Sequence, residues 1–210
     1  MPVDLLRETF EHYWRIFTDR RDGLIGWSDY TPYELRLVGT FVRLGWRERA
    51  RELLEFFFKD QRPAGWNQWA EVVGRDPRQS RFIGDMPHAW VASDYIRSVL
   101  DMFVYERQTD GALVLAKGIP DDWVEPTGFS VKNLRTPYGR VDLSFRPEGT
   151  DVLIEITGDA NPPGGFILPF PWARLANVDG SGARSSSLRD GELHIVRLPI
   201  KIRVMRADQG

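Results

Sequence analysis

The chain has 210 residues, no cysteine and a formal net charge of −2. A chain of this length can bury a sizeable core, either as one large domain or as two modest ones. The lack of cysteine excludes disulfides, thiolate catalysis and Cys-ligated zinc, and the lack of a positive field argues against a nucleic-acid partner.

The N-terminal segment, "MPVDLLRETFEHYW", has neither the apolar stretch nor the small-residue cleavage site of a secretion signal. The chain also lacks an apolar run long enough to span a bilayer, so no membrane partner is expected. For the chain as written, these features predict a cytoplasmic location.

Apolar residues follow a helical period up to about residue 108. Their spacing predicts a helix over residues 3–19, a second over 31–45 and a third over 46–60. Because only a very short turn separates the second helix from the third, the two should form a helical hairpin. Pro87 begins the fourth predicted helix, "PHAWVASDYIRSVLDMFVYER".

From residue 109 the period of the apolar residues falls to two. Short runs such as "ALVL", "GRVDLSF", "DVLIEI" and "IKIRVM" alternate with turn clusters such as "RPEGTD" and "GDANPPGG". About seven such runs predict an antiparallel β-sandwich. The predicted fold class is therefore α+β with two domains, a helical domain over 1–108 and a sandwich over 109–210. The boundary at 108–111 reads as a turn and not as a flexible linker, so we expect the two domains to pack rigidly against each other.

The segment "WNQWAEVVGRDPRQSRFIGDMPHAW", residues 66–90, has three tryptophans but neither a helical nor a strand period. Tryptophan faces attract the C–H faces of sugars, and carboxylates and amides bond their hydroxyls, so such a loop is suited to carbohydrate. The alternative is that the rings fill gaps under a long loop. The predicted ligand contacts in this segment are Trp66, Asn67, Gln68, Trp69, Asp85, His88 and Trp90.

Glu71 is the candidate catalytic residue of this segment, as a general base for glycosidic cleavage, because it follows groups that could hold a sugar and a water. A surface glutamate, or one paired with Arg75, is the simpler interpretation. For Asp85, a capping or turn role before the fourth helix is the favoured interpretation. His88 could equally be a buried histidine with both ring nitrogens satisfied.

A second aromatic and acidic loop, "GLIGWSDYTPYE", separates the first two predicted helices. Trp27, Asp29 and Tyr30 add to the predicted ligand contacts, because alternate loops of a ring of hairpins emerge at one end and would face each other. The three histidines lack metal-ligand spacing, and the chain has neither a G-x-S-x-G elbow nor a phosphate-binding glycine loop. No metal and no cofactor are therefore predicted.

Four segments, "GWNQWAEV", "RFIGDMPHAWVASDYIRSVLDMFVYE", "ALVLAKGIPDDWV" and "FSVKNLRTPYGRVDLSF", resemble the C-terminal part of six-hairpin, (α/α)6-barrel glycosidases of the α-L-rhamnosidase-like type. The resemblance covers roughly residues 1–170. It implies that the helices are a partial (α/α) toroid and that the sandwich is the C-terminal domain of a glycoside hydrolase. It also implies a carbohydrate ligand.

Two departures from that family pattern limit what the resemblance implies. The family places its catalytic-base glutamate where Asn67 stands here, and Glu71 is near but not equivalent. The family also has twelve barrel helices, whereas about four are predicted here, so its general acid has no counterpart.

Three hypotheses for the function follow. The first is the C-terminal portion of a glycoside hydrolase, incomplete as a catalyst alone, which associates with itself or with a chain that supplies the missing helices. The second is a non-catalytic carbohydrate-binding or structural module. In the third, both aromatic loops are packing elements and no ligand exists.

Overall fold

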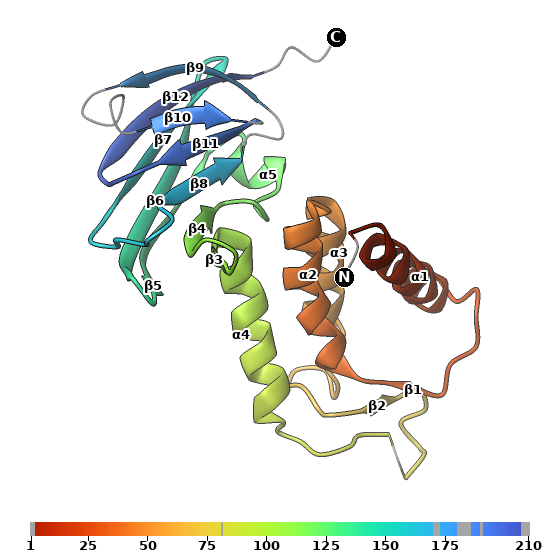
Figure 1. Cartoon of the computed structure of the whole chain (residues 1–210). Coiled ribbons are helices and arrows are strands. Elements are labelled where there is room, and N and C mark those ends of the chain that lie inside the picture. The colour runs from red at the N-terminus through yellow and green to blue at the C-terminus, as the bar shows by residue number, and fades with distance from the viewer. Residues whose placement is uncertain (1–2, 81, 170–172, 180–185, 190, 207–210) are drawn as a thin grey trace.

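A computed structural model describes residues 3–80, 82–169, 173–179, 186–189 and 191–206 (Figure 1). The chain has the mixed α+β character predicted from its sequence. The helices of the N-terminal half lie on one side of the molecule and two larger sheets lie on the other. Within the described part of the chain, no helix is both long and apolar enough to cross a membrane.

The helical elements follow the predicted order with small shifts at their ends. They are α1 (Val3–Arg21), the 3-10 helix η1 (Pro32–Leu35), α2 (Arg36–Leu44), α3 (Arg47–Lys59), α4 (Ala89–Phe103) and the short α5 (Asp121–Val124). The Thr31 side chain accepts a hydrogen bond from Tyr33 N and so begins η1. Gly45, with φ +78°, ends α2 in the left-handed conformation and confirms the predicted short turn of the hairpin.

Aromatic side chains hold the helices together. Phe17 of α1, Phe41 of α2 and Phe57 of α3 are completely buried. Helix α2 packs against both α3 and α4. The Arg20 guanidinium makes two hydrogen bonds to the Glu34 carboxylate, at 2.9 and 2.8 Å, and thereby fixes α1 to η1.

The fourth predicted helix is shorter than the sequence pattern suggested. Helix α4 ends at Phe103, and the next four residues form strand β3 (Val104–Arg107). The prediction of helix through Arg107 was wrong because β3 finds a partner in β4 (Ala112–Leu115), with which it pairs from end to end. Main-chain pairing in a hairpin with the next segment outweighed the local helical period.

A turn does occur at residues 108–111, but it lies within one sheet, between β3 and β4, and not at the junction between the two halves. Asp110 N and Gly111 N both donate to Arg107 O, which closes the β3–β4 hairpin, and α4 runs into β3 with no intervening residue. The next loop approaches α4 closely, since a Cβ added to Gly118 would lie 2.7 Å from Met102 Cα. The first strand of the two larger sheets is β3, which begins at Val104, within the segment that was predicted to belong to the helical half.

Two five-stranded sheets form the rest of the molecule. One has the order β10-β11-β8-β4-β3 and the other β5-β6-β7-β12-β9. Their remaining strands are β5 (Phe129–Thr136), β6 (Gly139–Glu148), β7 (Asp151–Gly158), β8 (Phe166–Pro169), β9 (Ala173–Asp179), β10 (Ser186–Arg189), β11 (Glu192–Ile195) and β12 (Ile200–Arg206). The pairing of β4 with β8 is parallel, so the first sheet is mixed and the prediction of a purely antiparallel arrangement needs correction.

The two sheets share one hydrophobic core. Leu113, Leu115 and Phe166 of the first sheet belong to the same buried cluster as Leu143 and Ile154 of the second. The alternation noted in "GRVDLSF" is present in β6, where Val141, Leu143 and Phe145 are buried and the residues between them are partly exposed.

Candidate functional site

The two aromatic loops lie against each other, as predicted. Strand β1 (Asp29–Tyr30) of the first loop pairs antiparallel with β2 (Val73–Gly74) of the second. The Thr31 hydroxyl donates to Glu71 O at 2.7 Å and extends the contact beyond the paired strands. The N-terminal end of η1 is therefore fixed to the loop that carries Glu71.

The loop over residues 66–90 is more regular than its sequence suggested. It folds back on itself, with Gly84 N donating to Val72 O at 2.8 Å and Glu71 N donating to Asp85 O at 2.9 Å. In this register Glu71 lies opposite Asp85. Both side chains are exposed, and both carboxylates lie close enough to Tyr33 to raise its pKa.

A chain of hydrogen bonds connects Asp85 to the interior of the site. His88 Nδ1 lies 3.1 Å from Asp85 Oδ2, and His88 Nε2 lies 2.6 Å from the Tyr33 hydroxyl oxygen. The His88 side chain is 10% exposed, whereas that of Asp85 is 72% exposed. The chain therefore runs from a nearly buried ring to a carboxylate at the surface.

The surroundings of Tyr33 favour the protonated form of its hydroxyl. Partial burial raises the pKa of Tyr33, and Arg36 opposes this effect. Three nearby carboxylates raise the pKa further: Glu71, Asp94 and Asp85. Tyr33 therefore remains protonated at neutral pH, and its hydroxyl can donate to His88 Nε2 in the tautomer whose ring proton is on Nδ1 and faces Asp85. In this arrangement both nitrogens of His88 are occupied, and the ring orients Asp85.

Trp90 and Arg36 border this chain. The Trp90 ring lies 5.8 Å from the His88 ring and is 70% exposed. The Arg36 guanidinium lies 4.1 Å from the centre of the Tyr33 ring and donates to Asp94 Oδ2 at 2.6 Å. The site thus combines an open aromatic face, exposed carboxylates and a cation at the N-terminal ends of η1, α2 and α4.

Two residues predicted to contact a ligand are instead buried. The Trp69 indole N–H donates to Phe57 O at 3.0 Å, and its ring packs on Tyr95 at 4.6 Å. The Tyr30 hydroxyl is bonded to the Asp60 carboxylate, and burial raises its pKa. Neither side chain is open to a ligand in this structure, so both depart from the expectation and act as packing elements under the loops.

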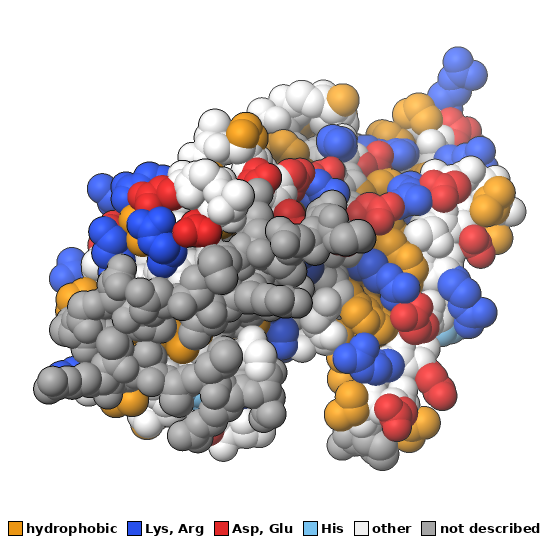
Figure 2. Space-filling view, turned by 90° about the horizontal axis from the view of Figure 1, so that it is seen from above, with side chains coloured by type: hydrophobic (Ala, Val, Ile, Leu, Met, Phe, Trp, Pro, Cys, Tyr) orange, Lys and Arg blue, Asp and Glu red, His pale blue; other side chains and the backbone are white. Residues whose placement is uncertain are grey.

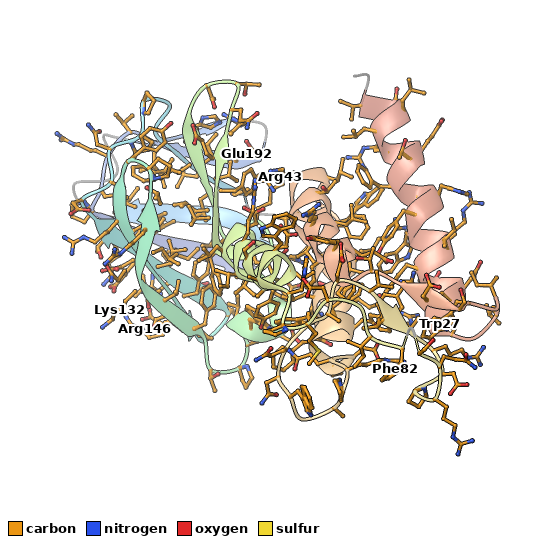
Figure 3. The ribbon with its side chains drawn as sticks, turned by 90° about the horizontal axis from the view of Figure 1, so that it is seen from below. Trp27, Arg43, Phe82, Lys132, Arg146 and Glu192 are labelled. Carbon is orange, nitrogen blue, oxygen red and sulfur yellow. The ribbon has the colours of Figure 1, made fainter. Side chains whose placement is uncertain are left out.

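The remaining predicted residues make no hydrogen bond to Asp85, His88 or Tyr33. Trp27 packs edge-on against Tyr30 and beneath the guanidinium groups of Arg62 and Arg75, at the outer edge of the helical half (Figure 3). Asp29 accepts a hydrogen bond only from Ser28 among the described residues.

Three further predicted residues, Trp66, Asn67 and Gln68, are exposed. Their side chains have no hydrogen-bond partner among the described residues. The structure therefore brings together only Glu71, Asp85, His88 and Trp90 of the predicted set.

Three residues of this site were not predicted: Tyr33, Arg36 and Asp94. All three lie within the second or the fourth predicted helix. Tyr33 stands in the quoted loop "GLIGWSDYTPYE", so the enrichment of that loop in aromatic residues was a usable signal. Nothing in the linear sequence indicates that the N-terminal ends of α2 and α4 meet.

Among the described residues, no group of three or more His, Asp or Glu side chains is arranged to hold a metal ion. Comparison with known proteins found no matching family model, no matching curated protein and no matching solved structure.

Proposed function

We propose that the chain is a carbohydrate-active protein whose ligand lies over Glu71, Asp85 and Trp90. The observation that supports this most is the exposed Trp90 ring beside a carboxylate that His88 and Tyr33 orient. An aromatic face can pack on the C–H face of a sugar while oriented carboxylates bond its hydroxyls. The resemblance of the surrounding segments to six-hairpin glycosidases supports the same ligand class.

The finer proposal for the fold is a partial (α/α) toroid, the C-terminal portion of a six-hairpin glycoside hydrolase. The contacts of α2 with both α3 and α4 are consistent with consecutive hairpins of such a ring. The meeting of the two aromatic loops at one end of these helices supports the placement of a ligand there.

In the hydrolase proposal, Glu71 acts on the substrate as the general base and Asp85 is the second carboxylate of the site. The Glu71 side chain has no hydrogen-bond or ion-pair partner within the described residues, so its oxygens are open to a water. Glycosidic cleavage needs two carboxyl groups on opposite sides of the bond. Because both carboxylates here project from one hairpin, we expect turnover by this chain alone to be weak or absent.

Binding is tested with Trp90→Ala. The probes are 4-nitrophenyl glycosides, beginning with the α-L-rhamnopyranoside, and the readout is calorimetry with saturation-transfer NMR. Because the ring is exposed, the fold should persist and affinity should fall at least tenfold, about 1.4 kcal/mol. Unchanged affinity, or no saturable binding by the unmutated chain to any member of the panel, would overturn the proposed site.

Catalysis is tested separately with Glu71→Gln and Asp85→Asn. Loss of nitrophenol release with retained glycoside binding would support the hydrolase. Saturable binding without release by the unmutated chain would favour the second candidate, a non-catalytic carbohydrate-binding module. That candidate is favoured by the projection of both carboxylates from one hairpin, because glycosidic cleavage needs carboxyl groups on opposite sides of the bond.

We also propose that the helical half associates with a second copy or with a chain that supplies further helices. Exposed apolar side chains on α4 and α3 support this, among them Ile96, Leu100 and Phe58. Seen from above, hydrophobic side chains lie among the charged ones on the helical half (Figure 2). Light scattering after size exclusion should give a mass above that of the monomer, and a well-behaved monomer would count against self-association.

A further inference from the structure

A cleft that shares Arg36 and Asp94 with the candidate carbohydrate site lies where the helical half meets the sandwich. Its volume is about 830 Å³, and it follows the facing sides of α2 and α4 as far as β3. Figure 3 shows Arg43 on the helical side of this junction and Glu192 on the sandwich side. The volume falls within the range of about 300–1,000 Å³ that is typical of small-molecule sites.

The cleft is richer in positive than in negative charge. Its cationic lining residues are Arg36, Arg43, Arg97, Arg107 and Lys117. Its carboxylates are Asp94, Asp101 and Glu106. Five cations against three carboxylates leave an excess of two positive charges, although the whole chain has a net charge of −2.

Each of the three carboxylates already has a donor. Asp94 accepts a hydrogen bond from Arg36 at 2.6 Å, and Asp101 accepts two from Arg43, at 2.8 and 3.3 Å. Glu106 accepts a hydrogen bond at 2.6 Å from the hydroxyl of Tyr138, which lies in the turn between β5 and β6. Within the lining of the cleft, only Arg36 and Arg43 are therefore paired with a carboxylate.

Two of the five cations, Arg97 and Lys117, have no anionic partner among the described residues. Arg107, by contrast, is paired with Asp110 at 2.6 Å and lies 3.7 Å from Glu192. Arg97 makes no hydrogen bond, ion pair or ring contact with any described residue. The Lys117 ammonium donates to Arg43 O at 3.3 Å and makes no ion pair with a described carboxylate.

The surroundings of Lys117 disfavour its positive charge. Burial lowers its pKa, and Glu192 opposes this effect. Three cations act in the same direction as burial: Arg107, Arg43 and Arg7. An anion bound beside the ammonium group would offset the cost of holding a charged lysine there.

We propose that this cleft binds a small phosphate-bearing anion, inorganic phosphate or a phosphomonoester, between Arg97 and Lys117. Such a group carries a charge of about −1.5 to −2 at neutral pH, which matches the two unpaired cations. Its oxygens accept charge-assisted hydrogen bonds from guanidinium and ammonium groups. Thr40 and Gln108 also line the cleft and have no side-chain partner among the described residues, so they are available as further donors.

The inference does not depend on the proposed carbohydrate site, and it is tested by calorimetry on the full chain at low ionic strength. The probes are inorganic phosphate, glucose 1-phosphate and glucose. The variants are Arg97→Gln and Lys117→Met, each expected to weaken phosphate binding at least tenfold. Matched controls are Arg197→Gln and Lys132→Met, which remove exposed cations outside the cleft and should leave affinity within twofold (Figure 3).

Tighter binding of glucose 1-phosphate than of phosphate would identify a phosphorylated sugar as the ligand, and equal binding would identify free phosphate. The inference is overturned if the unmutated chain shows no saturable binding, or if the control variants weaken binding as much as the cleft variants do. Binding of a poly-glutamate peptide in place of phosphate would also overturn it and would assign the cleft to an acidic protein segment.

Discussion

The sandwich and the helical half cover their hydrophobic side chains to different extents. Ten of the eleven large hydrophobic side chains that are exposed among the described residues belong to residues 3–100, and Val196 is the other. The two sheets share one core and cover each other's inner faces, whereas α1 buries only Phe17 completely and α4 leaves Ile96 and Leu100 exposed. The hydrophobic inner faces of the sandwich are therefore covered, whereas the helical half leaves hydrophobic side chains exposed. Both candidate sites involve residues of this helical half.

Both halves contain paired and unpaired cations. On the sandwich, the exposed Arg197 has no ion pair with a described residue, whereas Arg140 pairs with Asp159 at 2.8 Å and Arg203 with Glu148 at 2.8 Å. At the junction with the helices, Arg97 and Lys117 lack such partners. Unpaired charge beside a cleft indicates a ligand more strongly than paired charge on a flat surface does.

The largest effect should come from the sandwich core. Ile154→Ala removes a completely buried side chain and should lower the free energy of unfolding by about 2–5 kcal/mol, as measured by urea denaturation. Leu24→Ala, at a position 75% exposed in the loop after α1, is the matched control and should change it by about 0.5 kcal/mol or less. Equal effects at both positions would break the comparison between the covered inner faces of the sandwich and the exposed side chains of the helical half.

A smaller effect is expected where the helical half does bury charge. Glu34→Ala leaves the Arg20 guanidinium, whose side chain is 11% exposed, without its partner and should cost about 3 kcal/mol. Glu52→Ala removes the partner of Arg21 in a more exposed pair and should cost about 1 kcal/mol or less. Urea midpoints of the two variants decide this, and a mild effect of Glu34→Ala would mean that α1 is held mainly by its aromatic contacts.

The smallest effect concerns a surface ion pair of the sandwich. Hydrogen bonds from the Arg140 guanidinium and backbone lower the pKa of Asp159 to about 2. Because the folded-state pKa is below the unfolded value, the stabilisation is present above about pH 4 and is lost as the pH falls toward 2. Arg140→Gln should reduce this acid-dependent loss in urea midpoints measured from pH 6 to pH 2. An identical pH profile for both proteins would show that the pair does not contribute.

Much of the fold could be predicted from the sequence because local rules governed those segments. The turn at Gly45, the start of η1 at Thr31 and the alternation in β6 follow from one left-handed residue, one capping hydroxyl and one two-residue period. Strand β3 was missed because its apolar residues continue the helical period of α4, although its partner β4 is the next segment of the chain. The parallel pairing of β4 with β8 could not be predicted in this way, because it depends on which distant segment supplies the hydrogen bonds.

The candidate site divides in the same manner. Glu71, Asp85, His88 and Trp90 were predicted because one loop concentrates aromatic and acidic residues, and that density is visible in a linear sequence. Tyr33 was missed because its contact with His88 spans 55 residues, which no local pattern encodes.

By itself, the sequence determined that the longer helices precede the two larger sheets, that α2 ends at Gly45 and that η1 begins at Thr31. It also determined the loops in which sugar-binding side chains could occur. These features depend on neighbours along the chain. Only the tertiary structure decided that Trp69 and Tyr30 are buried while Trp90 is exposed, that His88 bonds both Asp85 and Tyr33, and that a positive cleft exists in a chain of net negative charge. Burial and pairing depend on what the rest of the fold brings alongside a residue, and that information is distributed over the whole chain.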